Sequence, residues 1–415
     1  MPVAAFFAED RRYMEETRVF VEQSDRRIDP FGDPIGETLI LNKPLHLWQT
    51  QAFCDARLTP CESLRPPCLV VPDTLFASGG ALRAFVDGAA GQDAVLVLKR
   101  SAFGKMTTPV QPQVRETEEG YLFEAIRFVS GKSTTARSVV VDPQEKVLQI
   151  QLPRQYIGED QVSIGLPRHP VMTLHHWVHI LWANQIASGY VARATPTWKG
   201  ILKVLWSVLR AGSLNKWKIL RKFSSQGKKC DIHPTALVEG SILGDGVSVG
   251  PYARVLFSTV GDGVSIMGGA QVEFSVLGER SVVSQLSVLR FSVLYPEAMA
   301  SQYLMQQSVL GRSAMTTGGA FTIDLNFEKP IQVPLDGKLH STGQRFLGSA
   351  FGHRCRIGTG FYLASGRTVP NDYFLIRNPA RVLTKLPPGL ANAGPLLADE
   401  RVLRPLRNDK TEKTE

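Results

Sequence analysis

One stretch of the chain contains no acidic residue. Between residues 161 and 230 there is no Asp or Glu, although the 415-residue chain has 38 acidic residues in all. The remaining 36 basic residues are balanced by those 38, so the net charge of +9 arises in this stretch alone. It holds 11 of the 47 basic residues: Arg168, Arg193, Lys199, Lys203, Arg210, Lys216, Lys218, Arg221, Lys222, Lys228 and Lys229.

The sequence also lacks features that would place it across a membrane or outside the cell. It has no apolar run of about 18 residues, the length that a membrane-spanning helix needs. The opening MPVAAFFAEDRRYMEE has no basic leader, so it is not expected to be a signal peptide. The five cysteines form no Cys-x-x-Cys pair, which favours reduced thiols in a cytoplasmic protein. The length predicts two or three domains.

The C-terminal half contains a repeat with a period of 17 residues. GSILGDGVSV, FSTVGDGVSI, FSVLGERSVV and FSVLYPEAMA follow one another at this spacing, and QSVLGRSAMT comes 16 residues later. Within each period, aliphatic residues recur in steps of six, six and five: Leu243, Val249, Val255, Val260, Ile266, Val272, Leu277 and Val283. Serines mark the same point of each period: Ser241, Ser258, Ser275, Ser292 and Ser308.

This spacing predicts three short strands per period, joined by corners into a triangular coil. One aliphatic side chain from each hexad points inward, and stacked coils bury a continuous apolar column. Gly and Asp-Gly fall where corners need a positive φ or little bulk. A β-sandwich is rejected, because strands of period two would not space their aliphatic residues by six.

The pattern resembles the hexapeptide-repeat family, on the repeats IHPTAL, LGDGVS, VGPYAR, VGDGVS and IMGGAQ. The resemblance implies a left-handed parallel β-helix, usually in a homotrimer, and in many members acyl transfer from acetyl-CoA or acyl carrier protein. Other members are tails on sugar nucleotidyltransferases. We therefore expect a mixed fold: an α/β domain over 1–160, a basic helical linker over 161–229, the β-helix over 230–386 and a disordered tail over 387–415.

The repeat is interrupted at residues 318–345, which fit no hexad. In the resembled family such an excursion often covers the active site; the alternative is a surface insertion without a role. The repeat then resumes with aliphatic or aromatic residues six apart: Phe351, Ile357, Leu363 and Val369.

Two histidines near this interruption are candidate general bases. LHSTGQRFLGSAFGHRCRIGTG resembles the acetyltransferase half of the bifunctional uridylyltransferase–acetyltransferase of amino-sugar metabolism. The resemblance points to His340, although it lies three residues further from Phe346 than in that family, and Ser349 stands where Asp is usual. His353 is the rival candidate. Acyl transfer needs a base with a pKa near neutrality, as imidazole has. The alternative for each is a hydrogen-bonded structural histidine.

FLIRNPARVLTKL resembles the C-terminal segment of hexapeptide acetyltransferases, where the last coil ends near coenzyme A. The resemblance implies a donor-binding role for Asn378, Arg381 and Lys385. Arg377 stands where the family often has Gly. The three cations could bind the phosphates of a CoA-type donor. Alternatively, the segment simply ends the stack of coils.

Residues 1–160 contain a strand-helix-strand pattern: PCLVVPD, then TLFASGGALRAFVDG with Thr74 or Ser78 near the helix start, then DAVLVLKRS. With a β-helix after it, this resembles the sugar-1-phosphate nucleotidyltransferases, in which a strand-end Asp binds Mg²⁺; Asp73 would be its relic. A helix-capping Asp73 is the alternative. The family's Gly-rich basic phosphate loop is absent, and DPFGDPIGETL is only a weak candidate. We therefore expect a degenerate domain.

The acid-free stretch predicts basic amphipathic helices. Apolar residues fall on one face: Trp198, Ile201, Leu202, Leu205, Val208 and Leu209. The cations and boundary tryptophans suit an anionic membrane surface: Lys199, Lys203, Trp206, Arg210, Lys216, Trp217 and Lys218. A helical pair packed between the domains is the alternative. Nucleic acid is disfavoured because no known nucleic-acid motif is present.

The sequence also bears on metal binding and on the activity of the protein. His175 and His179 share a helical face, but no third ligand is visible, so no metal is expected. We expect an acyltransferase that uses an acyl-CoA, in the first place acetyl-CoA, and a sugar or sugar-nucleotide acceptor of envelope polysaccharide or lipid synthesis. The alternatives are a non-catalytic scaffold at the membrane surface and an active sugar nucleotidyltransferase. The expected location is cytoplasmic, with peripheral attachment to the inner face of the membrane.

Overall fold

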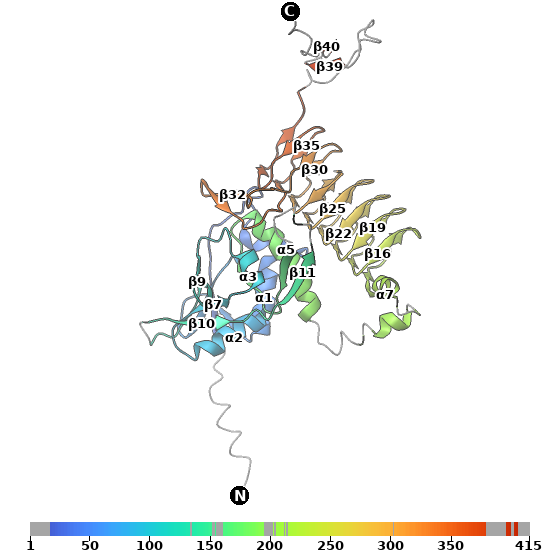
Figure 1. The fold of residues 1–415 in the computed structure, drawn as a ribbon. Coiled ribbons are helices and arrows are strands. Elements are labelled where there is room, and N and C mark those ends of the chain that lie inside the picture. Colours follow the sequence, from blue (N-terminus) through green and yellow to red (C-terminus); the bar gives the residue numbers. More distant parts are fainter. Residues whose placement is uncertain are drawn as a thin grey trace, which may run out of the picture.

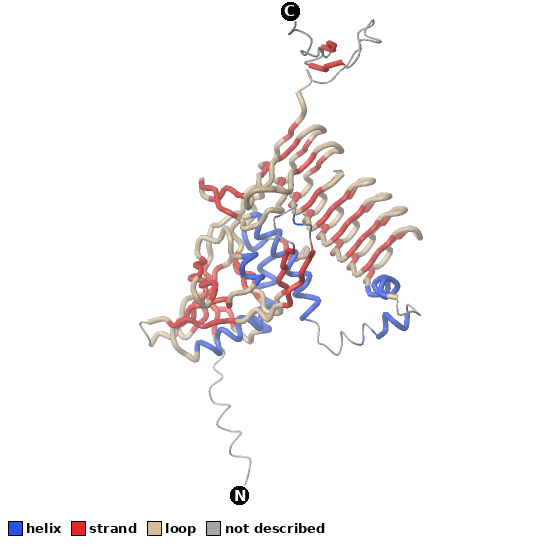
Figure 2. Tube along the Cα trace, viewed as in Figure 1, coloured by secondary structure: helices blue, strands red, loops and turns tan. Residues whose placement is uncertain are grey.

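The structure is a computed structural model in which an N-terminal α/β domain precedes a C-terminal prism of stacked strands (Figures 1 and 2). It describes residues 17–378 except 133–134, 152–153, 155–160, 195–201, 203–204, 211, 213–214 and 302, together with 396–399 and 402–405. The last two segments are strands β39 (Leu396–Asp399) and β40 (Val402–Pro405), which pair antiparallel.

The N-terminal domain is built on a mixed sheet of seven strands. The order is β10-β7-β9-β5-β1-β4, with β8 also paired to β9. The long strand β9 is antiparallel to its neighbours, and the other pairs are parallel. The strands are β1 (Arg18–Glu22), β4 (Thr59–Cys61), β5 (Cys68–Pro72), β7 (Ala94–Lys99), β8 (Val114–Glu116), β9 (Gly120–Val129) and β10 (Arg137–Val141).

Helices and small strand pairs surround this sheet. The helices are η2 (Ile35–Glu37), α1 (Leu45–Asp55), α2 (Gly79–Ala89), α3 (Ala102–Thr107) and α5 (Trp177–Ala194). The pairs are β2 (Leu39–Ile40) with β3 (Lys43–Pro44), β6 (Leu75–Ala77) with β13 (Val171–Thr173), and β11 (Lys146–Gln151) with β12 (Gln161–Leu166), all antiparallel.

The strand-helix-strand pattern is present, with two differences. The helix starts at Gly79, after Ser78, whose side chain accepts a hydrogen bond from the Ala81 N–H at 3.1 Å. The three residues before Ser78 form β6 instead of helix, because β13 pairs with them. The strands β5 and β7 are also not adjacent, since β9 lies between them. Parallel strands joined by a helix can be separated by one antiparallel strand that arrives later in the chain.

The helix α5 is part of the N-terminal core. Its side chains Trp177 and Trp182 are fully buried, and most of its first three turns pack against the sheet domain. The first half of the segment expected as a linker therefore belongs to the N-terminal domain. The large apolar side chains of α5 are buried in that domain. The lack of acidic residues in this stretch did not predict their burial.

The C-terminal domain consists of coils whose strands stack in three parallel sheets, the arrangement of a three-sided β-helix. One sheet contains β14 (Ser225–Gln226), β17 (Ile242–Leu243), β20 (Thr259–Val260), β23 (Val276–Leu277), β26 (Val293–Leu294), β29 (Val309–Leu310), β34 (Ala350–Phe351) and β37 (Thr368–Val369). The second contains β15 (Asp231–Ile232), β18 (Ser248–Val249), β21 (Ser265–Ile266), β24 (Val282–Val283), β27 (Met299–Ala300), β30 (Met315–Thr316), β35 (Arg356–Ile357) and β38 (Phe374–Leu375).

The third side is shorter. It contains β16 (Leu237–Glu239), β19 (Arg254–Leu256), β22 (Gln271–Glu273), β25 (Val288–Arg290) and β28 (Met305–Gln306), followed by the separate pair β31 (Phe321–Thr322) and β36 (Tyr362–Leu363). Residues 17 apart pair across successive coils, as Val255 does with Val272. The aliphatic residues of the repeat form one buried column. The periodicity thus predicted the coils and their core; left-handedness stays a prediction.

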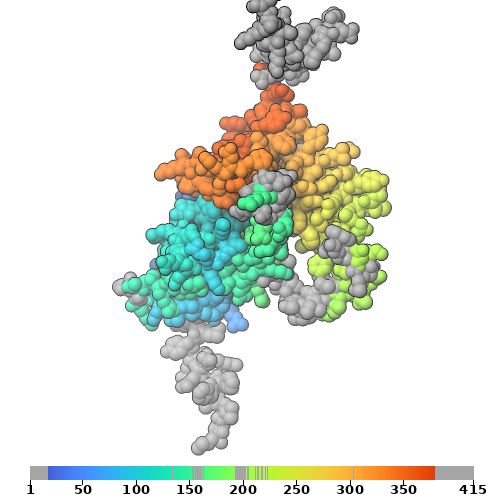
Figure 3. Space-filling model, in the orientation of Figure 1, coloured from blue at the N-terminus to red at the C-terminus, as the bar shows by residue number. Residues whose placement is uncertain are grey.

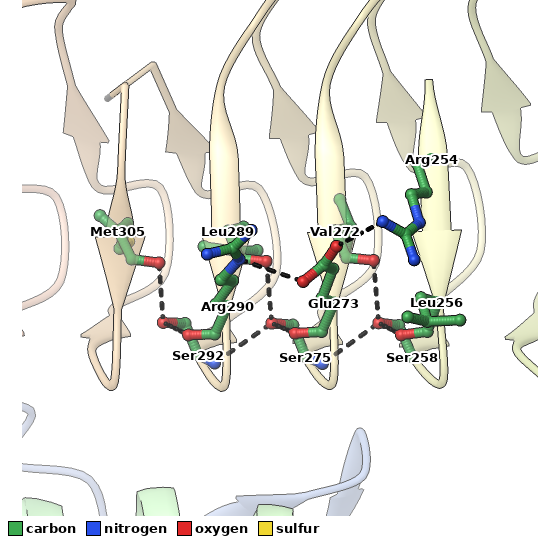
Figure 4. A network of polar contacts seen from close by, with 10 residues as sticks. All are labelled: Arg254, Leu256, Ser258, Val272, Glu273, Ser275, Leu289, Arg290, Ser292 and Met305. Atoms are coloured by element: carbon green, nitrogen blue, oxygen red, sulfur yellow. Dashed lines mark hydrogen bonds and ion pairs between the residues drawn. The ribbon is translucent and has the colours of Figure 1, made fainter. Parts of the chain in front are cut away.

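The repeated serines form a ladder inside one edge of the prism. The Ser275 hydroxyl donates to the Glu273 carbonyl at 2.8 Å and accepts the N–H of Ser292 at 3.2 Å. The same pattern recurs from coil to coil (Figure 4). Each hydroxyl therefore satisfies a backbone N–H at a corner where no strand partner is available.

Replacing one serine of the ladder is expected to destabilise the prism. Ser275→Ala leaves the buried Ser292 N–H without its acceptor, which costs about 1–3 kcal/mol. Ser248→Ala, at an exposed strand position, is the matched control and should change stability by less than about 0.5 kcal/mol. Urea unfolding measures both. Equal losses in the two variants would contradict the structural role of the ladder.

The interruption in the repeat is a β-hairpin. The chain leaves the coil after β31 and returns at β34, and between them β32 (Gln332–Leu335) and β33 (Lys338–Ser341) pair antiparallel. Ile331, Val333 and Leu347 pack into the same apolar core as the N-terminal domain. The hairpin therefore covers part of that domain (Figure 1).

The two domains share a continuous apolar interface. Outward-facing residues of the later coils, Val276, Val293, Val309 and Ala350, are buried in the core of the N-terminal domain. The equivalent residue of an early coil, Ile242, is 53% exposed. The N-terminal domain therefore covers one end of this sheet, and Figure 3 shows it against the later, orange coils.

The first coil is capped by helix α7 (Lys216–Phe223), which packs against β16. Arg221 lies 3.7 Å from the buried carboxylate of Glu239. The Ser224 hydroxyl donates to the Val238 carbonyl at 3.3 Å. A helix at this place covers the open end of the apolar column, which would otherwise contact water.

Candidate functional site

His353 lies in a polar junction between the domains. It sits at a corner of the β-helix, is 4% exposed and contacts the rings of Phe31 and Tyr295, which stack on each other at 5.3 Å. Its Nδ1 accepts the Arg312 N–H at 2.8 Å, and its Nε2 donates to Asp33 Oδ2 at 3.1 Å. Both ring nitrogens are thus occupied, so His353 presents no unbonded base in this arrangement.

Asp33 is the centre of this junction. Its carboxylate accepts two hydrogen bonds from Arg312 Nη1, at 2.7 and 2.9 Å. Burial alone would raise the pKa of Asp33, but the hydrogen bonds and charges of His353 and Arg312 outweigh burial and hold that pKa below its usual value. A second link joins Asn371 Nδ2 to the Phe31 carbonyl at 2.7 Å.

The junction was not predicted from the sequence. Asp33 belongs to DPFGDPIGETL, the weak candidate for a phosphate-binding loop. The structure shows this loop inserted against the β-helix instead, with Phe31 and Asp33 as its contacts. In the sequence, this loop is marked only by an aromatic residue and two aspartates among prolines and glycines. The same composition is typical of an ordinary surface turn.

His340 lies on the excursion hairpin, in β33, opposite Val333. It is half-buried and close enough to His176 of the N-terminal domain to lower the pKa of that residue. Its ring has no hydrogen-bond partner in the part of the chain that the structure describes. No hydrogen bond or ring contact joins His340 to His353 there either. The catalytic roles of both histidines stay predictions.

A buried cluster of histidines lies beneath the hairpin, at the start of α5. His179 Nδ1 accepts the N–H groups of His175 and His176 at 3.0 and 3.1 Å, and its Nε2 bonds to the Pro109 carbonyl at 2.9 Å. Burial, followed by the charge of His179, lowers the pKa of His175 and of His176 to about 3. Burial lowers the pKa of His179 to about 4. All three are neutral at pH 7.

These histidines organise a helix start. His179, in the first turn of α5, accepts the backbone N–H groups of His175 and His176, the two residues that precede the helix. Within the described ranges, no group of three His, Cys, Asp or Glu side chains is placed to hold a metal ion. The hydrogen bonds of His179 give the pair His175 and His179 a structural role, and the expectation that it binds no metal stays a prediction.

Asp73 follows β5 and is 5% exposed. Its carboxylate accepts hydrogen bonds from the N–H of Ser24 at 2.6 Å and from the hydroxyl of Ser24 at 2.9 Å. Asp73 is therefore not the helix cap that was considered, because Ser78 has that role. It instead holds the turn after β1.

The last coils expose basic and aromatic side chains together. Arg377 is exposed and lies over the corner glycine Gly360, where an added Cβ would come within 2.9 Å of its guanidinium. Arg356 lies over the ring of Phe374 at 5.9 Å. Phe374 is 65% exposed and Tyr362 is 75% exposed. Neither arginine has a carboxylate partner among the described residues.

The remaining candidates for donor binding are partly placed. Asn378 is exposed at the end of the last coil and makes at least one polar or ring contact. Arg381 and Lys385 lie outside the described residues. The structure therefore brings Arg377 and Asn378 to the end of the prism and leaves the other two untested.

The candidate membrane-contact residues are also partly placed. Trp206 is 63% exposed, and Arg210 and Lys218 are exposed. Helix α7 includes Lys216 and Trp217, whose side chains are not described. The backbone and side chains of Trp198, Lys199 and Lys203 lie outside the described residues. In the described part of the chain, no helix combines the length and apolar character needed to cross a bilayer.

Comparisons with known proteins add little to this picture. A scan against protein-family models finds no match, and a search of curated proteins finds none either. One similar solved structure is the acetyltransferase domain of PglB from Neisseria gonorrhoeae FA1090, in complex with acetyl coenzyme A, at 13% identity and a TM-score of 0.14. The match covers 37% of this chain and 56% of that one. So weak a likeness supports neither a fold nor an activity.

Proposed function

We propose that the protein transfers an acyl group from a coenzyme A thioester to an amine or hydroxyl of a sugar or sugar nucleotide. The observation that carries the proposal is the exposed pair Arg356 and Arg377 at the last coils, without carboxylate partners among the described residues. Guanidinium groups of this kind suit the phosphates of a CoA-type donor. The aromatic surface around Phe374 and Tyr362 suits its adenine and pantetheine parts.

The reaction needs a base for the acceptor. The acceptor oxygen or nitrogen attacks the thioester carbonyl, the base takes its proton, the carbon–sulfur bond breaks, and the thiolate leaves and is protonated. His340 suits this role better than His353, because its ring is half-buried and unbonded within the described chain, whereas both nitrogens of His353 are bonded.

The proposal includes a homotrimer, the usual assembly of the resembled family. Figure 1 shows the hairpin that carries His340 beside the N-terminal domain and at the same end of the prism as the later coils. Arg367 of these coils donates a hydrogen bond to the Gln332 carbonyl of the hairpin at 3.0 Å. No hydrogen bond joins His340 to Arg377 among the described residues. A neighbouring copy would supply the missing partner of each site, so base and donor would meet between subunits.

Ligand binding and turnover test this function together. Acetyl-CoA and longer acyl-CoAs are expected to raise the melting temperature, since a ligand at about 100 times its Kd stabilises by about 2.7 kcal/mol. Arg377→Glu should remove the shift, and Arg280→Glu, at an exposed corner between β23 and β24, should keep it. Release of the CoA thiol with a panel of amino sugars and sugar nucleotides measures turnover. No shift with any acyl-CoA would refute the proposal.

Turnover in mixed variants tests the roles of the residues. His340→Ala is expected to abolish thiol release while leaving the acyl-CoA shift intact. Mixing His340→Ala with Arg377→Glu chains should restore part of the activity, because some intersubunit sites then hold both native residues. Full activity in His340→Ala would remove that histidine from the mechanism.

A non-catalytic scaffold is the second candidate. The bonded state of His353 and the occupied carboxylate of Asp73 favour it, since both groups serve structure here. Absence of an acyl-CoA shift together with normal assembly would support it. An active nucleotidyltransferase would require Mg²⁺-dependent pyrophosphate release that is lost in Asp73→Ala.

A further inference from the structure

A stripe of apolar side chains is exposed just before the first coil. Leu202, Leu205, Trp206 and Leu209 are 56%, 53%, 63% and 73% exposed. Their spacing of three, one and three places them on one helical face. Residues 205–210 are helical, and Gly212 then ends the helix, with a φ of +56° and its N–H bonded to the Val208 carbonyl at 3.1 Å.

Exposed cations flank this stripe. Arg210 ends the helix, and Lys218 and Arg221 follow on α7. Lys228 and Lys229 are exposed at the first coil, and the whole stretch contains no acid. The one ion pair described here is Arg221 with Glu239, at 3.7 Å. An apolar face beside a surface rich in cations is the pattern of helices that lie at the surface of an anionic bilayer.

We propose that this stripe and its cations seat the protein on anionic phospholipid, independently of the acyl transfer. Leu205, Trp206 and Leu209 would enter the boundary between headgroups and acyl chains, while the cations contact the headgroups. A second copy of the chain is a poorer occupant, because it would bring the same cations against each other. Nucleic acid would satisfy the charge and leave the aliphatic side chains without an apolar partner.

The capping role of α7 fixes the orientation of the protein. Because α7 packs on β16, the first coil would face the lipid. Eight strands stack in the longest sheets, at about 4.8 Å per coil, so the last coil would lie about 34 Å from the first. Arg356 and Arg377 would then face the cytoplasm, where a soluble donor is accessible.

Vesicle flotation of the full-length protein tests the proposal. The protein is expected to float with vesicles of phosphatidylcholine and phosphatidylglycerol and to remain below with phosphatidylcholine alone. The triple variant Leu205→Ser, Trp206→Ser, Leu209→Ser should reduce binding at least tenfold. Arg210→Glu with Lys218→Glu should do the same and abolish the salt dependence. Leu286→Ser with Tyr303→Ser, which changes two equally exposed apolar residues on other coils, should bind as the original does.

Several outcomes would overturn the inference. Equal binding to neutral vesicles would exclude the role of the cations. Binding to a DNA duplex that the triple serine variant retains, without flotation, would point to nucleic acid. Self-association lost in that variant, again without flotation, would assign the stripe to a second copy. Circular dichroism and an unchanged melting temperature confirm that each variant folds, since the altered side chains are exposed.

Discussion

Lowering the pH from 7 to 5 is expected to unfold the N-terminal domain, because its core holds three neutral histidines. The folded-state pKa values of His175 and His176 are lowered to about 3, and that of His179 to about 4. In the unfolded chain each would titrate near 6.5. Between pH 6.5 and the lowered pKa values, the unfolded state binds more protons than the folded state. The contribution of the neutral histidines to stability is therefore complete above pH 6.5 and is lost as the pH falls.

The size of this effect follows from the number of sites. Each pKa unit corresponds to about 1.4 kcal/mol, so three sites lower the free energy of unfolding by about 4 kcal/mol per pH unit below 6.5. A typical domain has roughly 5–15 kcal/mol in total. The groups that face the cluster do not compensate: Arg26 and His340 both disfavour added positive charge there.

Tryptophan fluorescence measures this transition directly. Trp177 and Trp182 are fully buried on α5 beside the histidines, so their emission should shift to the red as the core opens. Replacing all three histidines by Gln should move the acid midpoint down by about one pH unit. His46→Gln, at a histidine 47% exposed, is the control and should leave it in place. A midpoint below pH 4 in the original protein would show that carboxylates dominate instead.

Removing the carboxylate of Asp33 is expected to loosen the two domains from each other. Asp33→Ala leaves Arg312, and the buried Nε2 of His353, without their shared acceptor. Breaking a buried ion pair by removing one partner costs about 3–5 kcal/mol, and the partial exposure of Arg312 reduces this to about 2–3 kcal/mol. Since the lowered pKa of Asp33 adds stability above its unfolded value near 3.8, the same contribution disappears in acid.

A neighbouring ion pair supplies the control. Asp372 also binds an arginine through two hydrogen bonds, to Arg354 at 2.6 and 2.7 Å, and both side chains are exposed. Asp372→Ala should therefore change neither stability nor shape measurably. Calorimetry should show one transition in the original protein and two in Asp33→Ala, with a larger radius of gyration by small-angle scattering. A single unshifted transition in Asp33→Ala would mean that the apolar interface alone joins the domains.

The sequence by itself determined the prism. Its coils pair only with their neighbours, 16 or 17 residues away until the hairpin interrupts them, so one local period specified the strands, the inward residues and the serine ladder. Helical periodicity placed Leu202, Leu205 and Leu209 on one face with Trp206 at its boundary, and all four side chains are exposed. The strands β5 and β7 were visible as short buried runs.

Only the tertiary structure decided how the domains meet. Arg312 and His353 lie 279 and 320 residues from Asp33 in the chain, and such pairs leave no periodic trace. The same holds for the insertion of α5 into the N-terminal core, since a stripe that faces a core and one that faces lipid have the same spacing. In the folded protein, Trp177 is buried in the core and Trp206 is exposed. The packing of the excursion hairpin against the N-terminal domain likewise depends on contacts between segments far apart in the chain.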